Sequence, residues 1–253
     1  MFWFKPSVIN VDCFTSNAMV HEHFRIDRAS KFFPEEIKLL PNYIEIKANH
    51  DPSSNLKESI GTLRKCTALI ELFSVGMIIP CWSDISLEAT ELGHVHYIDR
   101  VARADDNWLT VQPHQRMQFG SGIYPNHASL KLIPPWYIEE KVGVKFAWNM
   151  CDWHRTEIAS KVRVVSGLID FKHQHQVNIN MFMEKNSTIT FEAGDPLVHL
   201  IPMSDKKIKL HHHLIDKDIF MDKTRKNMIE TQYHNHRKLR DQSEAKCPFG
   251  FGK

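Results

Sequence analysis

Residues 164–203, with the sequence VVSGLIDFKHQHQVNINMFMEKNSTITFEAGDPLVHLIPM, form the most regular stretch of the chain. Val177–Met183 alternates between apolar residues and asparagine, apart from Phe182, and an alternating and then apolar pattern returns over Thr188–Ile201. A period of two, bounded by Gly, Asn, Asp and Pro, is typical of antiparallel strands with one buried face. The stretch predicts part of a β-sandwich or barrel, with 177–183 and 188–201 as adjacent antiparallel strands joined by the polar turn 184–187.

The composition is that of a folded globular protein. The chain has 253 residues, 42% hydrophobic and 25% charged, and a net charge of +2 gives no electrostatic signal for nucleic acid. No apolar run approaches the length of a membrane span. Five cysteines, odd in number and without a CxxC pair, indicate a reducing compartment rather than a disulfide framework. We therefore expect a soluble protein of the cytoplasm that does not bind a membrane.

The pattern along the chain predicts a β-rich α+β fold, with an antiparallel β-clip or jelly-roll-like sandwich or barrel from about Ile78 to Met203. Helices are expected at Ala29–Leu40 and Leu56–Phe73, where apolar residues recur at helical spacing, and should pack on the β-structure. We expect one β-rich domain over residues 1–210, including this helical part. The remaining residues, 211–253, should form a charged C-terminal arm.

The central stretch carries a resemblance. Gly167-Leu168-Ile169-Asp170, followed by a strand and then by residues 189–201, is similar to part of the trimeric dUTPase family. The resemblance implies that Asp170 would orient the attacking water in a nucleotide pyrophosphatase. Phe171 lies near, but not at, the position of the family's base-stacking tyrosine, and the family's phosphate-binding stretches have no counterpart here.

The order of several short motifs resembles an uncharacterised family of marine bacteriophage proteins. These motifs include Arg64-Lys65-Cys66, Pro80–Asp84, Pro134-Pro135-Trp136, Gly167–Asp170 and Cys247-Pro248-Phe249. The resemblance spans most of the chain and implies viral origin, with the protein in the host cytoplasm or in the virion. It implies no chemistry.

Histidine is over-represented, with 16 residues, so stability or assembly is expected to depend on pH. His173 and His175 alternate on an extended segment and would point to the same side, with His199 on a neighbouring strand as a third ligand. This set would hold a divalent metal ion. The alternative is that His173 and His175 are an ordinary surface pair.

Asp84 ends the sequence Cys81-Trp82-Ser83-Asp84, which follows an apolar strand. A thiol or hydroxyl beside a carboxylate would suit catalysis if a base lay within hydrogen-bond reach. The alternative is that Trp82 belongs to the core and that Asp84 caps a turn.

Three functions stay open. The first is a small-molecule-binding or metal-assisted enzyme with a pocket in the β-domain and Asp170 and Asp84 as catalytic carboxylates. The second is a phage structural or assembly protein that forms homo-oligomers through its C-terminal arm. The third is a dUTPase-like nucleotide pyrophosphatase.

Overall fold

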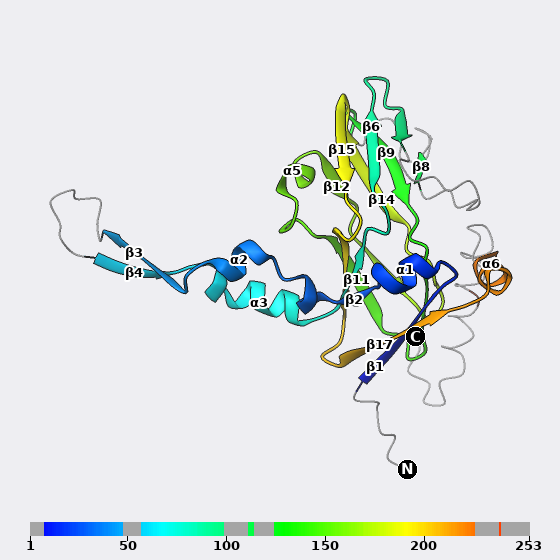
Figure 1. The fold of residues 1–253 in the computed structure, drawn as a ribbon, viewed down its shortest axis with the longest axis horizontal. Helices are drawn as coiled ribbons and strands as arrows, with labels where there is room; N and C mark the ends of the chain where they lie inside the picture. Colours follow the sequence, from blue (N-terminus) through cyan, green and yellow to red (C-terminus); the bar gives the residue numbers. More distant parts are fainter. Residues whose placement is uncertain (1–7, 48–56, 99–110, 114–123, 226–237, 239–253) are drawn as a thin grey trace, which may run out of the picture.

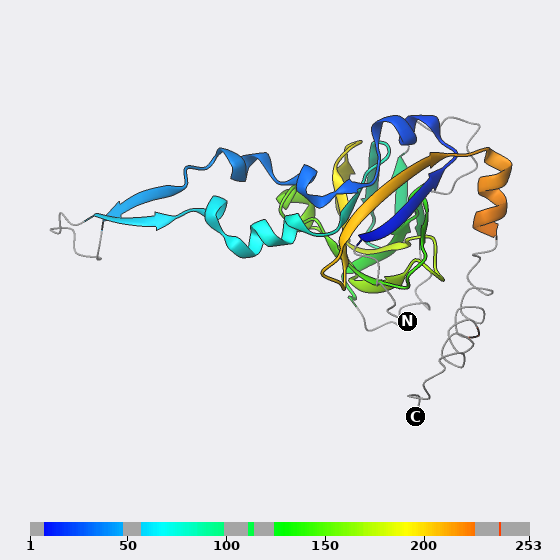
Figure 2. The ribbon, with the colours of Figure 1, turned by 90° about the horizontal axis from the view of Figure 1, so that it is seen from below.

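The computed structural model describes residues 8–47, 57–98, 111–113, 124–225 and 238. These residues form a β-rich α+β fold with two visibly different parts (Figures 1 and 2): a body of packed sheets, and an arm that projects away from it. We call residues 29–47 and 57–76 the hairpin arm. The expected charged segment beyond Arg225 and the Cys-Pro-Phe tail lie outside the described residues, apart from residue 238.

The first sheet joins the beginning of the chain to its later part. β1 (Val8–Thr15) lies between β10 (Tyr137–Glu140), to which it is antiparallel, and β17 (Lys207–Leu214), to which it is parallel. Alternate residues of β1 are buried, so the sheet contributes one face to the core. The domain boundary expected between residues 210 and 211 is wrong, because it falls inside β17. Helix α1 (Ala18–His23) follows β1, and Asn17 caps it by accepting the Val20 N–H at 3.2 Å.

A five-stranded sheet in the order β13-β11-β16-β5-β2 forms the middle of the body. Its strands are β13 (Gly167–Asp170), β11 (Lys145–Met150), β16 (Pro196–Pro202), β5 (Met77–Pro80) and β2 (Asp27–Arg28). Phe146, Ile169 and Leu200 point from its inner face into the main core. The sequence predicts the strand character of β5 and β16 correctly.

Two further sheets complete the body. One has the order β12-β14-β9-β8, the other β15-β6-β7. Their strands are β12 (Val162–Val164), β14 (Ile179–Glu184), β9 (His127–Leu132), β8 (Val111–Pro113), β15 (Ser187–Phe191), β6 (Ile85–Ala89) and β7 (Val95–Ile98). Within the described ranges these strands do not close into a barrel.

The predicted pairing of 177–183 with 188–201 is wrong, although both segments are extended. β14 pairs with β9 and β12, β15 pairs with β6, and β16 pairs with β5 and β11. The turn after β14 is held to the segment before β9, since Lys185 donates its backbone N–H to Asn126 O at 3.0 Å and its Nζ to Pro125 O at 2.7 Å. The chain therefore changes sheets at a turn that looks like a hairpin in the sequence.

The hairpin arm contains short elements on either side of an antiparallel β-hairpin. In chain order these are η1 (Ala29–Phe32), α2 (Glu35–Leu39), β3 (Tyr43–Lys47), β4 (Lys57–Gly61), η2 (Leu63–Lys65) and α3 (Thr67–Ser74). The helix expected at 29–40 is broken at Phe33, which is extended because a proline follows it. The helix expected at 56–73 is wrong in its first half, because Ile60 pairs with Ile44 in the hairpin instead.

Only the base of the hairpin arm packs on the body. Leu69 and Phe73 of α3 join Ala29, Ile37, Ile78 and Cys151 in a small second core. The expectation that the N-terminal helices pack on the β-structure is therefore met by α1, by α3 and by Ile37 of α2, while the hairpin β3–β4 projects outward (Figure 2). No helix in the described ranges is long and apolar enough to span a membrane.

Candidate functional site

Asp170 lies at the end of β13 and caps the turn that follows. Its Oδ1 accepts the backbone N–H of Lys172 at 3.0 Å, while its backbone carbonyl accepts those of His173 and Gln174. An aspartate that accepts the N–H two residues later is a common turn-forming arrangement. The geometry thus matches the turn-cap reading of this residue.

His175 is committed to the body rather than presented to a ligand. Its Nδ1 lies 3.0 Å from Ile138 O, and its ring stacks on Tyr137 with centroids 4.7 Å apart. Burial lowers the pKa of His175, while the bond to the Ile138 carbonyl opposes this shift. The neutral ring therefore serves as a packing element.

His199 is buried on the outer face of the five-stranded sheet, under the base of the hairpin arm. Its Nε2 lies 2.8 Å from Val75 O, and its ring stacks on Phe73. Burial is also the main reason that its pKa is lowered. Its nitrogen is used to hold the end of the arm to the sheet.

The predicted metal set is not brought together. His199 on β16 is opposed to Asn149 of β11, and Asp170 on β13 is opposed to Lys145 of β11. His199 and Asp170 therefore lie on opposite sides of β11, at positions four residues apart along it. This separation is about 13 Å along the strands and about 10 Å across them. Nowhere in the described part of the chain do three or more His, Cys, Asp or Glu residues lie close enough to hold a metal ion. The three-histidine site is therefore a wrong prediction, because strand periodicity gave the side on which a residue lies but not its neighbours.

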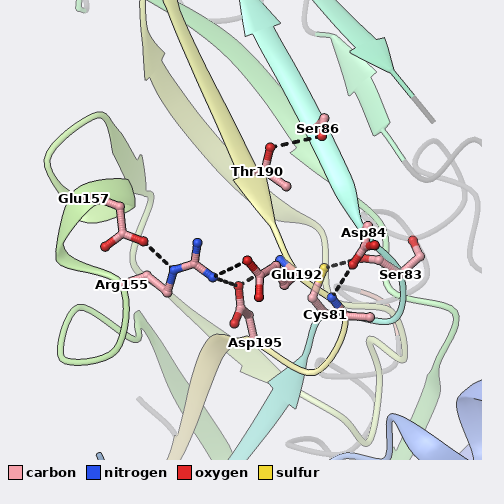
Figure 3. Close-up of polar contacts among 10 residues, drawn as sticks. Cys81, Ser83, Asp84, Ser86, Arg155, Glu157, Thr190, Glu192 and Asp195 are labelled. Atoms are coloured by element: carbon pink, nitrogen blue, oxygen red, sulfur yellow. Dashed lines mark hydrogen bonds and ion pairs between the residues drawn. The ribbon is translucent and has the colours of Figure 1, made fainter. Parts of the chain in front are cut away.

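Asp84 lies in a polar network between the β5–β6 and β15–β16 turns (Figure 3). Its Oδ1 accepts the backbone N–H of Ala193 at 2.9 Å, and two backbone hydrogen bonds join Cys81 to Gly194 and Asp195. Burial raises the pKa of the Cys81 thiol to about 12, so the thiol stays protonated and is a poor nucleophile. The Asp84 carboxylate thus holds the β15–β16 turn against the β5–β6 turn.

Arg155 links the same turn to the segment before α5 (Thr156–Ala159), and nothing in the sequence pattern marks it. Its guanidinium lies 2.7 Å from Asp195 and 3.6 Å from Glu192, and it also bonds to Glu157 (Figure 3). The pKa of Arg155 is raised, mainly by the hydrogen bond to Glu157. With three carboxylates around one cation, the network is a structural clamp rather than an anion site.

The outer face of the β10-β1-β17 sheet holds α6 (Lys217–Arg225) on the body. Lys223 Nζ lies 4.6 Å from the Phe14 ring centroid and 4.9 Å from that of Tyr137, and it bonds to Glu139 at 2.9 Å. Phe220 of the same helix is buried. The start of the segment expected to be a free C-terminal arm is therefore docked on its own chain.

The hairpin of the arm has one apolar and one polar face. In an antiparallel pair, directly opposed residues lie on the same face, so Ile44, Ile46 and Ile60 share a face with Glu58. The three isoleucines are 46, 38 and 41% exposed, respectively. The opposite face carries the Glu45–Lys57 ion pair at 2.8 Å. We call the first of these the isoleucine face.

Comparison with known proteins adds no assignment to this geometry. A scan against models of protein families matched none, and a search of the curated proteins found no relative.

Proposed function

We propose that this protein is a structural or assembly protein that joins copies of itself through its hairpin arm. The observation that carries the proposal is the isoleucine face, which is exposed on a hairpin that projects from the body (Figures 1 and 2). A phage structural or assembly role is one of the three functions that the sequence leaves open. The contact is expected through the N-terminal third of the chain rather than through its C-terminal end.

An isolated two-stranded hairpin is at best marginally stable in water, because it buries too little apolar surface. β4 is exposed along its whole length, and no described element of the same chain covers the isoleucine face. Aliphatic side chains on a projecting element are typical of an interaction site, because a monomer gains nothing from exposing them. A partner that covers this face would supply the missing burial.

The charge of the hairpin arm favours a protein partner. Its described residues include six Lys or Arg side chains and five Glu side chains, spread along its length. A nucleic acid or an anionic membrane would call for a basic excess, which is missing here. A near-neutral surface with exposed isoleucine suits a protein surface of the same mixed character.

The two other expected functions receive less support. The enzyme hypothesis depended on Asp170, His173, His175 and His199 lying together, and the structure separates His199 from Asp170. The pyrophosphatase hypothesis depended on Asp170 as a water-orienting carboxylate, whereas its Oδ1 caps a turn. Neither hypothesis accounts for the hairpin arm.

The test is the solution mass of the full-length chain, by sedimentation velocity, over a wide range of protein concentration. We expect the wild type to exceed the 29.5 kDa of one chain, and the Ile44→Glu, Ile46→Glu double variant to sediment as a monomer. Because both isoleucines are exposed in the free chain, the variant should keep its melting temperature.

Ser59→Lys is the matched control. It adds a charge to the same hairpin, but on the polar face opposite Glu45, and should leave the mass unchanged. A wild type that remains monomeric throughout, or an isoleucine variant that assembles as well as the wild type, would overturn the proposal.

A further inference from the structure

We infer that the isoleucine face of one copy docks on the outer face of the five-stranded sheet of a second copy. This inference rests on the proposed function and names the receiving surface. That surface is the uncovered part of the sheet formed by Ala147, Leu168, Ile201 and Met203, which we call the open face.

The open face follows from the register of three strands. Ala147 of β11 is directly opposed to Leu168 of β13 and to Ile201 of β16, so the three share one side. The neighbouring pair Phe146–Ile169 is buried in the main core, which places Ala147 and its partners on the outer side. Met203 follows two residues after Ile201 and extends the same row. Leu168 is 57% exposed and Met203 64% exposed.

The other half of this outer face is already covered by the hairpin arm of the same chain. His199 and Ile78 are opposed in the β16–β5 pair, and Phe73 and Leu69 of α3 pack over them. The cover ends between His199 and Ile201. The described part of the chain thus covers this outer face at His199 and Ile78 and leaves Leu168 and Met203 exposed.

The hairpin of the same chain cannot supply the rest. It continues outward beyond α2, away from the body of packed sheets, in both views (Figures 1 and 2). The hairpin of a second copy is free of this restriction. Its three isoleucines offer a flat aliphatic surface, and sheets pack face to face through such surfaces at a separation of about 10 Å.

The charges at the borders are complementary. Glu58 lies beside Ile46 and Ile60 on the isoleucine face, and Lys145 borders the open face, two residues before Ala147 on the same side of β11. Asp170 is opposed to Lys145 on this face, and its Oδ1 accepts the Lys172 N–H. A hairpin placed with Glu58 toward Lys145 sets its isoleucines over Leu168 and Ile201.

The contact would join two different surfaces, so it is heterologous in the sense used for oligomers. Two copies that exchange arms form a closed pair, whereas successive one-way contacts form a ring or a filament. In either case each chain gives one hairpin and receives one. Assembly therefore requires both surfaces on the chain.

Crosslinking between two distinguishable preparations tests the contact. One preparation carries Ile46→Cys, the other carries Met203→Cys and a fusion that changes its mass, and the two are mixed and mildly oxidised. We expect a disulfide-linked species with the summed mass of the two chains. Each preparation is also oxidised alone, as a control for disulfides formed by the native cysteines. In a matched control, Glu88→Cys, on the exposed side of β6, takes the place of Met203→Cys and should give no mixed species.

Leu168→Glu combined with Met203→Glu gives a second measurement. Both side chains are exposed, so the variant should keep its melting temperature while its mass in solution falls to that of one chain. If no mixed crosslink forms and this variant assembles normally, while Ile44→Glu, Ile46→Glu still abolishes assembly, then the hairpin docks elsewhere. The inference would then be wrong and the proposed function would stand. A wild-type monomer would contradict both.

Discussion

Lys223 Nζ lies 2.9 Å from Glu139 Oε1, and both side chains are more than two-thirds buried. The pair ties the last turn of α6 to β10, at a point where the Lys223 ammonium also lies over the rings of Phe14 and Tyr137. The Lys223 ammonium is partly shielded from water, so it needs both the carboxylate and the two aromatic rings to replace its hydration. The contact is specific because these three partners must be present together. The contact keeps the start of the C-terminal segment on the body.

Replacing Lys223 should therefore loosen α6. We expect Lys223→Ala to reduce the free energy of unfolding by about 1 to 2 kcal/mol, since it removes an ion pair and two cation–π contacts that are partly shielded from water. Urea unfolding measures the change, and hydrogen exchange should report faster exchange in α6. Arg225→Ala, at the exposed end of the same helix, is the control and should cost less than about 0.5 kcal/mol. An equal loss in both variants would contradict the docking role.

The buried histidines should make the protein less stable in mild acid. Burial is the largest cause of the lowered pKa values of His175, His199 and His212 in the folded chain, relative to 6.5 for an unperturbed ring. Below about pH 6.5 the unfolded chain therefore binds more protons than the folded chain. The neutral buried histidines contribute their full stabilisation above that pH, and this contribution is lost as the pH falls toward their pKa values in the folded chain.

We expect the melting temperature to stay level from about pH 8 to 7 and to fall between about pH 6.5 and 5, the range in which histidine charges. His199→Gln should lower stability at pH 8, because its bond to Val75 O is disturbed, and should also flatten the fall in acid. A wild-type melting temperature that does not change across this range would contradict the prediction.

Asp170 allows a direct test of turn cap against ligand. Asparagine keeps an oxygen that accepts the Lys172 N–H, so Asp170→Asn should cost less than about 0.5 kcal/mol, while Asp170→Ala should cost about 1 kcal/mol. Titration with Zn²⁺ or Co²⁺ should give the same result for the wild type and for both variants. Metal binding that is lost in Asp170→Asn, with stability unchanged, would restore the hypothesis of a metal site.

Gly167 should tolerate no side chain. A Cβ at this position would lie 2.5 Å from a ring carbon of Trp148, whose Nε1 donates to Val165 O at 2.6 Å. Since the indole is fixed by this bond, we expect Gly167→Ala to cost about 1 to 3 kcal/mol, the usual range for overpacking. Gly194→Ala is a useful comparison, because nothing lies within 4 Å of the added carbon and its cost would come from the positive φ of 94° alone.

The sequence alone determined the elements whose signal is local. The alternation in β14 and β15, the apolar runs of β5 and β16, and the turn residues between them predict strands, and these strands exist. The same patterns predict the β-rich α+β class. Such signals work because strand geometry places alternate side chains on opposite faces whatever the partner is. For Asp170 and Asp84, a cap was one of the readings that the sequence left open.

The tertiary structure alone decided which elements lie side by side. Periodicity shows that a strand has a buried face but gives no partner, so β14 and β15 were wrongly paired. For the same reason His199 was placed beside the residues around Asp170, which lie far from it. Leu56–Phe73 has the apolar content of a helix, but cross-strand pairing with residues 43–47 makes its first part a strand. The isoleucine face and the Lys223 contact depend on residues that are distant in the chain, and only the long-range pairing of strands brings such residues together or leaves them uncovered.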